Sequence, residues 1–171
     1  IQFLKNPEEK IKYAARGSRD ADTLAEQLAK IMQILLVKRL ESSFSAFLQS
    51  LQNLKHYTDN MREMWKNNTI FICPDIDVNA ELDYKAKSIK KGCRVTFQDC
   101  VEDVRKKIDK LNEQGRNEDG SNREYTRDDF NPTYYDLLTS DFDIIDDLCD
   151  RWGKNSEDPK LDKFKDALMQ T

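Results

Sequence analysis

The chain has 171 residues and a mass of 20.1 kDa, which fits one domain with room for one substantial core. Charged residues make up 35% and apolar residues 38%, a balance that suits a helical body with much exposed surface, and eight Phe and six Tyr argue against global disorder. The formal charge of −4 excludes a general attraction to nucleic acid, so any such contact must come from a local patch of positive charge.

The first part of the chain predicts one long helix. A short helix can open at Pro7 and run through Tyr13, because Pro is well placed in a first turn. From Asp20 to Asn67 the chain then contains neither Gly nor Pro. We therefore expect one helix over about residues 20–67, capped by one of the Asp residues at its start.

Two apolar stripes follow one another along this expected helix. The first steps through Leu24, Leu28, Ile31 and Leu35, and the second is out of phase with it, so the helix should face different neighbours before and after this point. Because residues 34–37 are apolar on every side of a helix, we expect protein to cover that turn all round. The second stripe consists of Leu40, Phe44, Phe47, Leu51, Leu54, Met61 and Trp65, with Thr58 as its polar member.

The middle of the chain predicts shorter elements. Residues 69–78 have β-like composition interrupted by Pro74, which predicts an extended segment or one short strand. A charged helix should span residues 80–91, and another should begin at Val95 or Phe97 and stop at Gly115. The polar stretch 116–126 is a candidate for local disorder.

The last part predicts two more helices. Asn131 followed by Pro132 is a start signal for a helix that runs to Gly153, and Asp158 followed by Pro159 repeats the signal for a final helix. The sequence thus predicts an all-α fold, an elongated helical bundle built on one long helix (about 20–67) with one short extended segment near 69–78, in a single domain over 1–171. The expected inward residues are Tyr135, Leu138, Phe142, Ile145, Leu148 and Trp152 in the first helix, and Leu161, Phe164, Leu168 and Met169 in the second.

We expect no catalytic, cofactor-binding or metal-binding residue in this chain. An acidic series over 141–150 is typical of a solvated helix face, since functional carboxylates with shifted pKa values are normally shielded from water. Irregularly spaced Cys with His56 as the one His favour free thiols over zinc or nucleophilic catalysis, and no phosphate loop is present. No apolar run approaches the roughly 20 residues of a membrane span. These acidic and thiol residues are Asp141, Asp143, Asp146, Asp147, Asp150, Cys73, Cys93, Cys100 and Cys149.

Basic clusters leave contact with phosphate open as an alternative to solvated helix faces. Lys38 and Arg39 differ from the others because they directly follow the apolar turn, and there we weigh a functional and a structural role evenly. The other clusters are Lys85, Lys87, Lys90, Lys91 and Arg94, and Arg105, Lys106, Lys107 and Lys110.

Two blocks of the sequence resemble bacterial superfamily-two ATPases related to the Swi/Snf helicases. The block LLVKRLESSFSAFLQSLQNL, residues 35–54, is similar to one that follows the first RecA-like lobe in those proteins. The block DPKLDKFKDALMQT, residues 158–171, is similar to the lead-in to their second lobe. The resemblance implies that the chain, which begins without Met, is an excised fragment: the helical insertion that joins the two motor lobes.

The resemblance further implies a role in a cytoplasmic, ATP-dependent DNA helicase or translocase. The insertion would couple the RecA-like lobes and contact nucleic acid, with duplex DNA as the expected partner and no membrane. ATP and magnesium would bind to the lobes of the whole hydrolase, and this chain would hold none of their ligands. The residues of the matching block that would contact nucleic acid or a lobe are Lys38, Arg39, Glu41, Ser42 and Ser43, with Glu41 and Ser42 orienting the two cations.

The charge distribution keeps other interpretations open. A DNA-gripping insertion should be basic, whereas residues 118–150 are strongly acidic, so that half is expected to dock on a lobe or on another protein. The alternative function is a stand-alone helical protein-interaction module, which would use the seam from Phe44 to Trp65 as a coiled-coil or bundle surface. An enzyme with an unrecognised site is a third interpretation.

Overall fold

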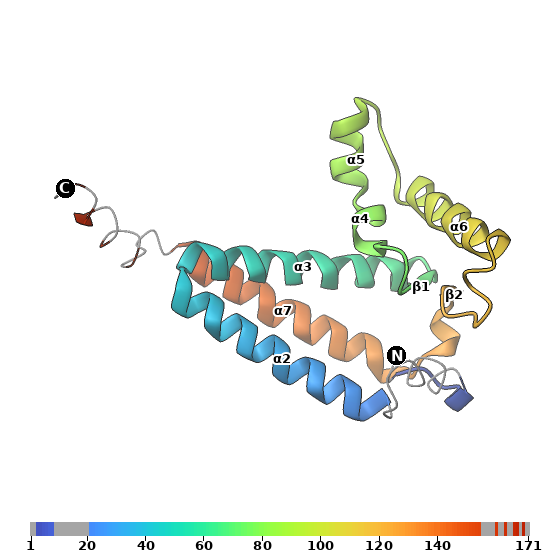
Figure 1. Cartoon of the computed structure of the whole chain (residues 1–171), viewed down its shortest axis with the longest axis horizontal. Helices are drawn as coiled ribbons and strands as arrows, with labels where there is room; N and C mark the ends of the chain where they lie inside the picture. Colours follow the sequence, from blue (N-terminus) through green and yellow to red (C-terminus); the bar gives the residue numbers. More distant parts are fainter. Residues whose placement is uncertain are drawn as a thin grey trace. The chain divides into compact units, whose positions relative to one another are not determined.

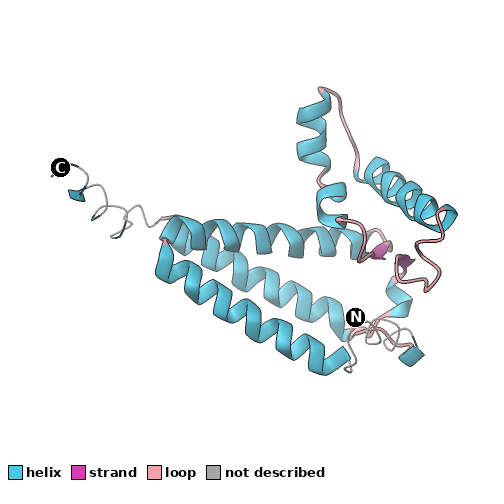
Figure 2. Ribbon diagram, viewed as in Figure 1, coloured by secondary structure: helices cyan, strands magenta, loops and turns pink. Residues whose placement is uncertain are grey.

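The computed structural model is mostly helical, which confirms the all-α class (Figure 2). It describes residues 3–8 and 21–154 and, beyond these, positions 160, 163, 166, 167 and 169. The elements in chain order are α2 (Ala21–Ser42), α3 (Phe44–Lys66), β1 (Ile70–Ile72), α4 (Val78–Leu82), α5 (Tyr84–Lys91), α6 (Phe97–Glu113), β2 (Arg123–Tyr125), the 3₁₀ turn η1 (Arg127–Asp129) and α7 (Thr133–Gly153).

The chain divides into two compact units. One unit, here called the sheet unit, comprises Ile1–Ala21 and Asn60–Tyr135, and the other, the hairpin unit, comprises Asp22–Asp59 and Asp136–Thr171. The helices α3 and α7 contribute residues to both units. The expectation of a single domain over 1–171 stays a prediction.

The expected helix over 20–67 is two helices, so this prediction was wrong. α2 ends at Ser42 and α3 begins at Phe44, and the two form the arms of a helical hairpin (Figure 1). Ser43 at the turn accepts a hydrogen bond from the backbone N–H of Ala46 through its Oγ, at 3.4 Å, as an N-cap does. Serine hydroxyls compete for backbone groups in this way, so the chain can reverse without Gly or Pro.

Aromatic side chains join α3 to α7 inside the hairpin unit. The Trp152 ring meets the rings of Phe44 and Phe47 edge to face, with centroid distances of 5.2 and 5.1 Å. Leu51, one turn further along α3, is 2% exposed. The second apolar stripe is therefore buried at these positions, as its spacing predicted, and the end of α7 lies against the start of α3. The first stripe was expected to face a neighbour too, but its Leu28, Ile31 and Leu35 are more than half exposed.

A compact core fills the sheet unit. Its members come from α3, β1, α4, α6 and β2, and α6 supplies the largest share because its inward positions recur every three or four residues. Removing these side chains from water is worth about 25 cal/mol per Å² of apolar surface. The side chains least exposed to solvent are Ile70, Leu82, Cys100, Val101 and Val104.

Two short strands pair residues 70–72 with residues 123–125, which lie in the stretch predicted as a polar loop. β1 pairs antiparallel with β2, so that Ile70 lies opposite Tyr125 and Ile72 opposite Arg123. The stretch 116–126 is thus ordered in part as a strand, and Ser121 and Asn122 are only 1% and 2% exposed. The prediction of local disorder there was wrong, whereas the short strand expected within 69–78 is confirmed.

Local signals decide where the remaining helices begin. Asp83 accepts a hydrogen bond from the backbone N–H of Ala86 and starts α5, so the single helix expected over 80–91 is split into α4 and α5. Thr96 and Asp99 form a reciprocal capping box, and α6 begins at Phe97 as predicted. Asn131 bonds to the start of α7, as its N-cap signal predicted. The helices expected from Pro7 through Tyr13 and from Asp158 onward fall largely outside the described residues.

Candidate functional site

The two cations of the block at 35–54 lie exposed near the C-terminal end of α2, with Arg39 in its last turn. Neither Lys38 nor Arg39 makes an ion pair with any residue that the structure describes. Both are therefore accessible to an anionic partner such as a phosphate. Lys38 and Arg39 form a local patch of positive charge, which is what a contact with nucleic acid needs in a chain of net charge −4.

The other predicted site residues sit at the same end of the helix without forming a polar network. Glu41 and Ser42 are exposed, and the Glu41 carboxylate pairs with neither cation among the described residues. Ser43 uses its hydroxyl to cap α3. The idea that Glu41 and Ser42 orient the two cations therefore has no contact in this structure to support it, and Ser43 has a structural role.

The apolar turn before these cations is not covered by protein, contrary to the prediction. Ile34, Leu35 and Val37 are 54%, 51% and 54% exposed. Only Leu36 and Leu40 at this end of α2 are half-buried. The physical reason is the turn at Ser43, because in a hairpin a helix packs with one side against its neighbours and leaves the other sides to solvent.

Two contacts at this end of the hairpin unit involve the block at 35–54. Trp152, near the end of α7, packs on Phe44 and Phe47 at the start of α3. The Lys160 ammonium donates a hydrogen bond to the backbone carbonyl of Glu41, in the last turn of α2. The chain thus leaves this place along α3 and returns to it along α7 (Figure 1).

The acidic series on α7 forms the solvated face that the sequence predicted. Asp141, Asp143 and Asp150 are exposed. Asp147 pairs with Arg151 one turn later, at 2.8 Å, and Asp146 pairs with Lys55 of α3. The hydrogen bond from Lys55 to Asp146 raises the pKa of the lysine. No group of three or more His, Cys, Asp or Glu suited to a metal occurs in the part of the chain that the structure describes.

Some cations of the basic clusters in the sheet unit form ion pairs inside the fold. Lys87 and Lys107 both bind the Glu81 carboxylate, at 2.9 and 2.6 Å, and Lys87 also reaches Asp103 at 3.5 Å. Burial alone would lower the pKa of Lys87, but the hydrogen bond and charge of Glu81 outweigh it and raise that pKa. These contacts fit the interpretation in which the cations form ion pairs within the fold or lie on solvated helix faces. Lys106, Lys110 and Arg116 make no ion pair within the described ranges.

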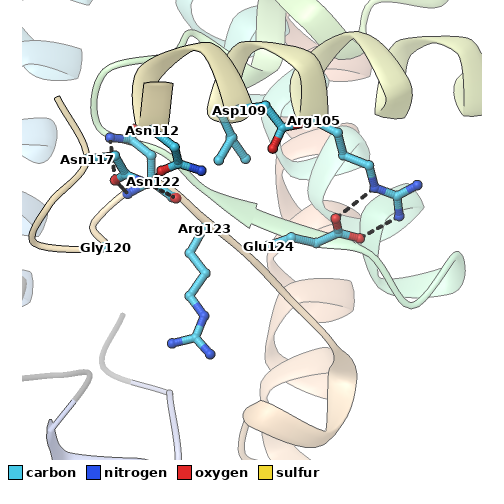
Figure 3. Close-up of a pocket in the computed structure, with 9 residues that line it drawn as sticks. Arg105, Asp109, Asn112, Asn117, Gly120, Asn122, Arg123 and Glu124 are labelled. Atoms are coloured by element: carbon cyan, nitrogen blue, oxygen red, sulfur yellow. Dashed lines mark hydrogen bonds and ion pairs between the residues drawn. The ribbon is translucent and has the colours of Figure 1, made fainter. Parts of the chain in front are cut away.

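A pocket of about 620 Å³ opens beside the C-terminal half of α6 and β2. Figure 3 shows the Arg105 guanidinium turned onto the Glu124 carboxylate, with its Nη2 2.7 Å and its Nε 2.8 Å from the two carboxylate oxygens. This hydrogen bond raises the pKa of Arg105 further above its ordinary value. Two Arg and two carboxylate side chains line the pocket together with amides, so the pocket does not favour a ligand of one sign of charge. Its lining residues are Arg105, Ile108, Asp109, Asn112, Asn117, Gly120, Asn122, Arg123 and Glu124.

Sequence reasoning missed this pocket because it took residues 116–126 for a loose loop. The amide of Asn122 donates to Asp75 at 2.7 Å and accepts from the Asp75 backbone N–H at 3.1 Å, and its own backbone N–H donates to Asn117. Asn117 also donates to Asn112 at 2.7 Å. A run of Asn and Gly is a turn signal, but nothing in it reveals that one Asn is buried with all its bonds satisfied.

A smaller pocket of about 380 Å³ in the hairpin unit contains the chain's histidine beside a thiol. His56 and Cys149 line it with Lys55, Asp59 and Asp150. Burial raises the pKa of the Cys149 thiol, which keeps it protonated and therefore a poor nucleophile. The arrangement does not make a Cys–His catalytic pair, and all four cysteines of the chain are free thiols.

Comparison with known proteins adds no family to this description. No protein-family model, no curated protein and no solved structure matches the chain. None of the described helices combines the length and the apolar character needed to cross a membrane.

Proposed function

We propose that the chain is the helical insertion between the two motor lobes of a Swi/Snf-related, ATP-dependent DNA helicase or translocase. The observation that supports this proposal is the hydrogen bond from the Lys160 ammonium in the second block to the Glu41 carbonyl in the first. Trp152, six residues before the second block, packs on Phe44 and Phe47 of the first. An insertion between two lobes that close on each other needs its entry and its exit side by side. The α3 and α7 helices provide that route out and back.

Within this function Lys38 and Arg39 bind the phosphate backbone of duplex DNA or the carboxylates of a neighbouring lobe. Their exposure and their lack of ion pairs within the described residues support this role. A net charge of −4 leaves such a local pair as the means of contact, because the chain as a whole repels phosphate weakly. ATP and magnesium would belong to the lobes, so the insertion would transmit motion rather than hydrolyse nucleotide.

The first prediction tests the two cations in the full-length protein. Replacing both, Lys38→Ala with Arg39→Ala, should lower DNA-stimulated ATPase activity while leaving the basal rate unchanged, because two phosphate contacts are lost away from the nucleotide. The slope of log affinity for duplex DNA against log salt should fall by about two. Steady-state ATPase assays and fluorescence anisotropy at several salt concentrations measure both quantities.

A matched control changes two other exposed cations that also make no ion pair in the described part of the chain. The variant Lys90→Ala with Arg94→Ala removes the same charge from the end of α5 and from the loop that follows it, and should leave stimulation intact. Equal losses in both variants would show a general charge effect. Unchanged stimulation in the Lys38 and Arg39 variant would refute the assigned contact.

The alternative is a stand-alone interaction module. The seam from Phe44 to Trp65 that it was expected to use is partly turned inward, with Phe47 and Trp65 each 9% exposed, which counts against that surface. The exposed apolar side chains of α2, such as Leu28, Ile31 and Leu35, favour the alternative because they offer it another binding surface. If the full-length protein neither hydrolyses ATP nor binds DNA in a salt-dependent manner, this alternative replaces the motor function.

A further inference from the structure

The cations of the sheet unit differ in whether a carboxylate already binds them. Lys87, for example, lies 2.9 Å from the Glu81 carboxylate. Lys110 and Arg116, by contrast, are exposed and make no ion pair with any residue that the structure describes. Because neither has a counter-ion to give up, both are available to form charge-assisted hydrogen bonds with an anionic ligand.

These two cations line the same pocket of about 290 Å³, which lies beside the C-terminal half of α6. Lys107, one turn before Lys110, also lines it. Among the lining residues that the structure describes, three are thus cations and one, Asp75, is a carboxylate. The excess of positive charge distinguishes this pocket from the larger one beside Glu124, where cations and carboxylates are equal in number.

The end of α6 fixes the position of Arg116. Gly115 has a φ of 64°, a left-handed conformation that glycine adopts without strain and that reverses the chain after a helix. The backbone N–H of Gly115 donates to the Asn112 carbonyl at 3.1 Å, and that of Arg116 donates to the Leu111 carbonyl at 2.9 Å. This Schellman pattern turns Arg116 back beside α6, and it occupies two carbonyl groups that would otherwise repel an anion at the helix end.

The carboxylates near this pocket are bound to other groups. Asp75 accepts a hydrogen bond from the Asn122 amide at 2.7 Å, and Glu81 holds Lys107 at 2.6 Å. Lys107 is therefore partly neutralised inside the fold. Lys110 and Arg116 are the cations whose charge is left for a ligand.

We propose that this pocket is a phosphate-binding site, in which Arg116 and Lys110 bind the phosphate oxygens and Lys107 adds further positive charge. A planar guanidinium donates two parallel hydrogen bonds to a phosphate, and a lysine ammonium contributes a compact charge beside it. The phosphate belongs either to a nucleic-acid backbone or to a free phosphorylated molecule, and its recognition is the same in both. The site does not depend on the proposed motor function, and it lies in a different compact unit from Lys38 and Arg39.

A loss-of-charge variant of the 171-residue chain tests the site with two probes, a short DNA duplex and inorganic pyrophosphate. If the phosphate belongs to the backbone, Lys110→Gln with Arg116→Gln should lower the slope of log duplex affinity against log salt by about two and weaken binding at low salt at least about threefold. Fluorescence anisotropy measures the duplex, and isothermal titration calorimetry measures pyrophosphate. The variant Lys110→Arg with Arg116→Lys keeps both charges and should keep the salt slope. Circular dichroism of each variant checks that the helices persist.

A gain-of-charge variant tests the same pocket without removing any side chain that the site uses. Gln114 is exposed and lines the pocket, so Gln114→Lys adds a cation to its wall and should tighten binding of the bound probe at least about twofold. The control Gln98→Lys adds the same charge at the other end of α6, where Gln98 is also exposed. Because that position is about 24 Å away along the helix and charges are screened within about 8–10 Å, the control should change binding less.

The two probes also identify the source of the phosphate. A loss of duplex binding in the Lys110 and Arg116 variant assigns the site to a nucleic-acid backbone, and a loss confined to pyrophosphate assigns it to a free phosphorylated molecule. Failure of the unmodified chain to bind either probe, or unchanged binding of both probes in that variant, would overturn the site. Equal tightening by Gln114→Lys and Gln98→Lys would also overturn it. None of these results depends on DNA-stimulated ATPase activity, so failure of this site is distinguishable from failure of the motor function.

Discussion

At the scale of single residues, the sheet unit depends on polar side chains that a hydropathy scale would place in water. Asn122, at 2% exposure, holds the turn at Asp75 to the loop at Asn117 through its amide and its backbone. Each buried polar group left without a partner costs about 1–3 kcal/mol, so this residue is as necessary as the apolar core around it. A substitution that removes the Asn122 amide leaves the groups of Asp75 that now bond to it without these hydrogen bonds.

The thiols give a second test at this scale. Burial raises the pKa of Cys73 to about 11, whereas Cys93 is exposed. At pH 8 the thiolate of Cys73 is scarce, so iodoacetamide should alkylate Cys93 first and Cys73 far more slowly. Mass spectrometry of timed digests measures both rates.

The pH dependence of Cys73 follows from the direction of its shift. A thiol whose pKa is raised in the folded state favours folding only while it stays protonated, so folding stability should fall as pH rises from about 9 towards 11. Labelling of Cys73 should accelerate over the same range. Equal labelling of Cys73 and Cys93 at pH 8 would contradict this account of burial.

At the scale of elements, α2 and α3 have similar composition but differ in how far their apolar side chains are buried. The apolar stripe of α3 is buried at Phe47 and Leu51, while that of α2 is about half exposed at Leu28 and Ile31. The apolar residues are gathered more sharply on one side in α3 than in α2, where residues 34–37 are apolar all round. The neighbours that the turn at Ser43 brings to each helix add a tertiary effect to this local difference.

The prediction at this scale concerns the capping box at the start of α6. Thr96 Oγ1 accepts from the backbone N–H of Asp99 at 3.2 Å, and the Asp99 carboxylate accepts from the Thr96 backbone N–H at 2.8 Å. Thr96→Ala should therefore lower the free energy of unfolding by about 1 kcal/mol, and Thr96→Ser should retain most of it. Urea denaturation followed by circular dichroism measures the change. A loss as large for Ser as for Ala would argue against the cap.

At the scale of the whole molecule, each compact unit contains one of the two tryptophans. Trp65 belongs to the core of the sheet unit, and Trp152 packs on aromatic rings in the hairpin unit. Variants that keep a single tryptophan, made with Trp152→Phe or Trp65→Phe, therefore report on one unit each. Separate compact units need not unfold in one transition.

Leu82→Ala tests whether the units unfold separately. Leu82 is 1% exposed in the sheet unit, so the truncation should cost about 2–5 kcal/mol in the transition that Trp65 reports. The transition that Trp152 reports should shift much less. The control Ile89→Ala removes a side chain that is 85% exposed and should change neither by more than about 0.5 kcal/mol. Equal shifts at both tryptophans would mean that the chain unfolds as one body.

The sequence by itself determined the class of the fold and the places where most helices begin. Local signals carry that information, since a cap at Thr96 or Asn131 needs only the next few residues. The second apolar stripe and the solvated acidic face of α7 were predictable for the same reason, because helical periodicity alone assigns residues to sides.

Only the tertiary structure decided the turn at Ser43, the exposure of Leu28 and Ile31 on α2 and the burial of Asn122. Whether an apolar side chain is covered depends on which distant segments reach it, and no local pattern contains that choice. The placement of Trp152 against Phe44 and Phe47 joins residues more than a hundred positions apart. That contact follows from the packing of α7 on α3 and not from the local sequence of either helix.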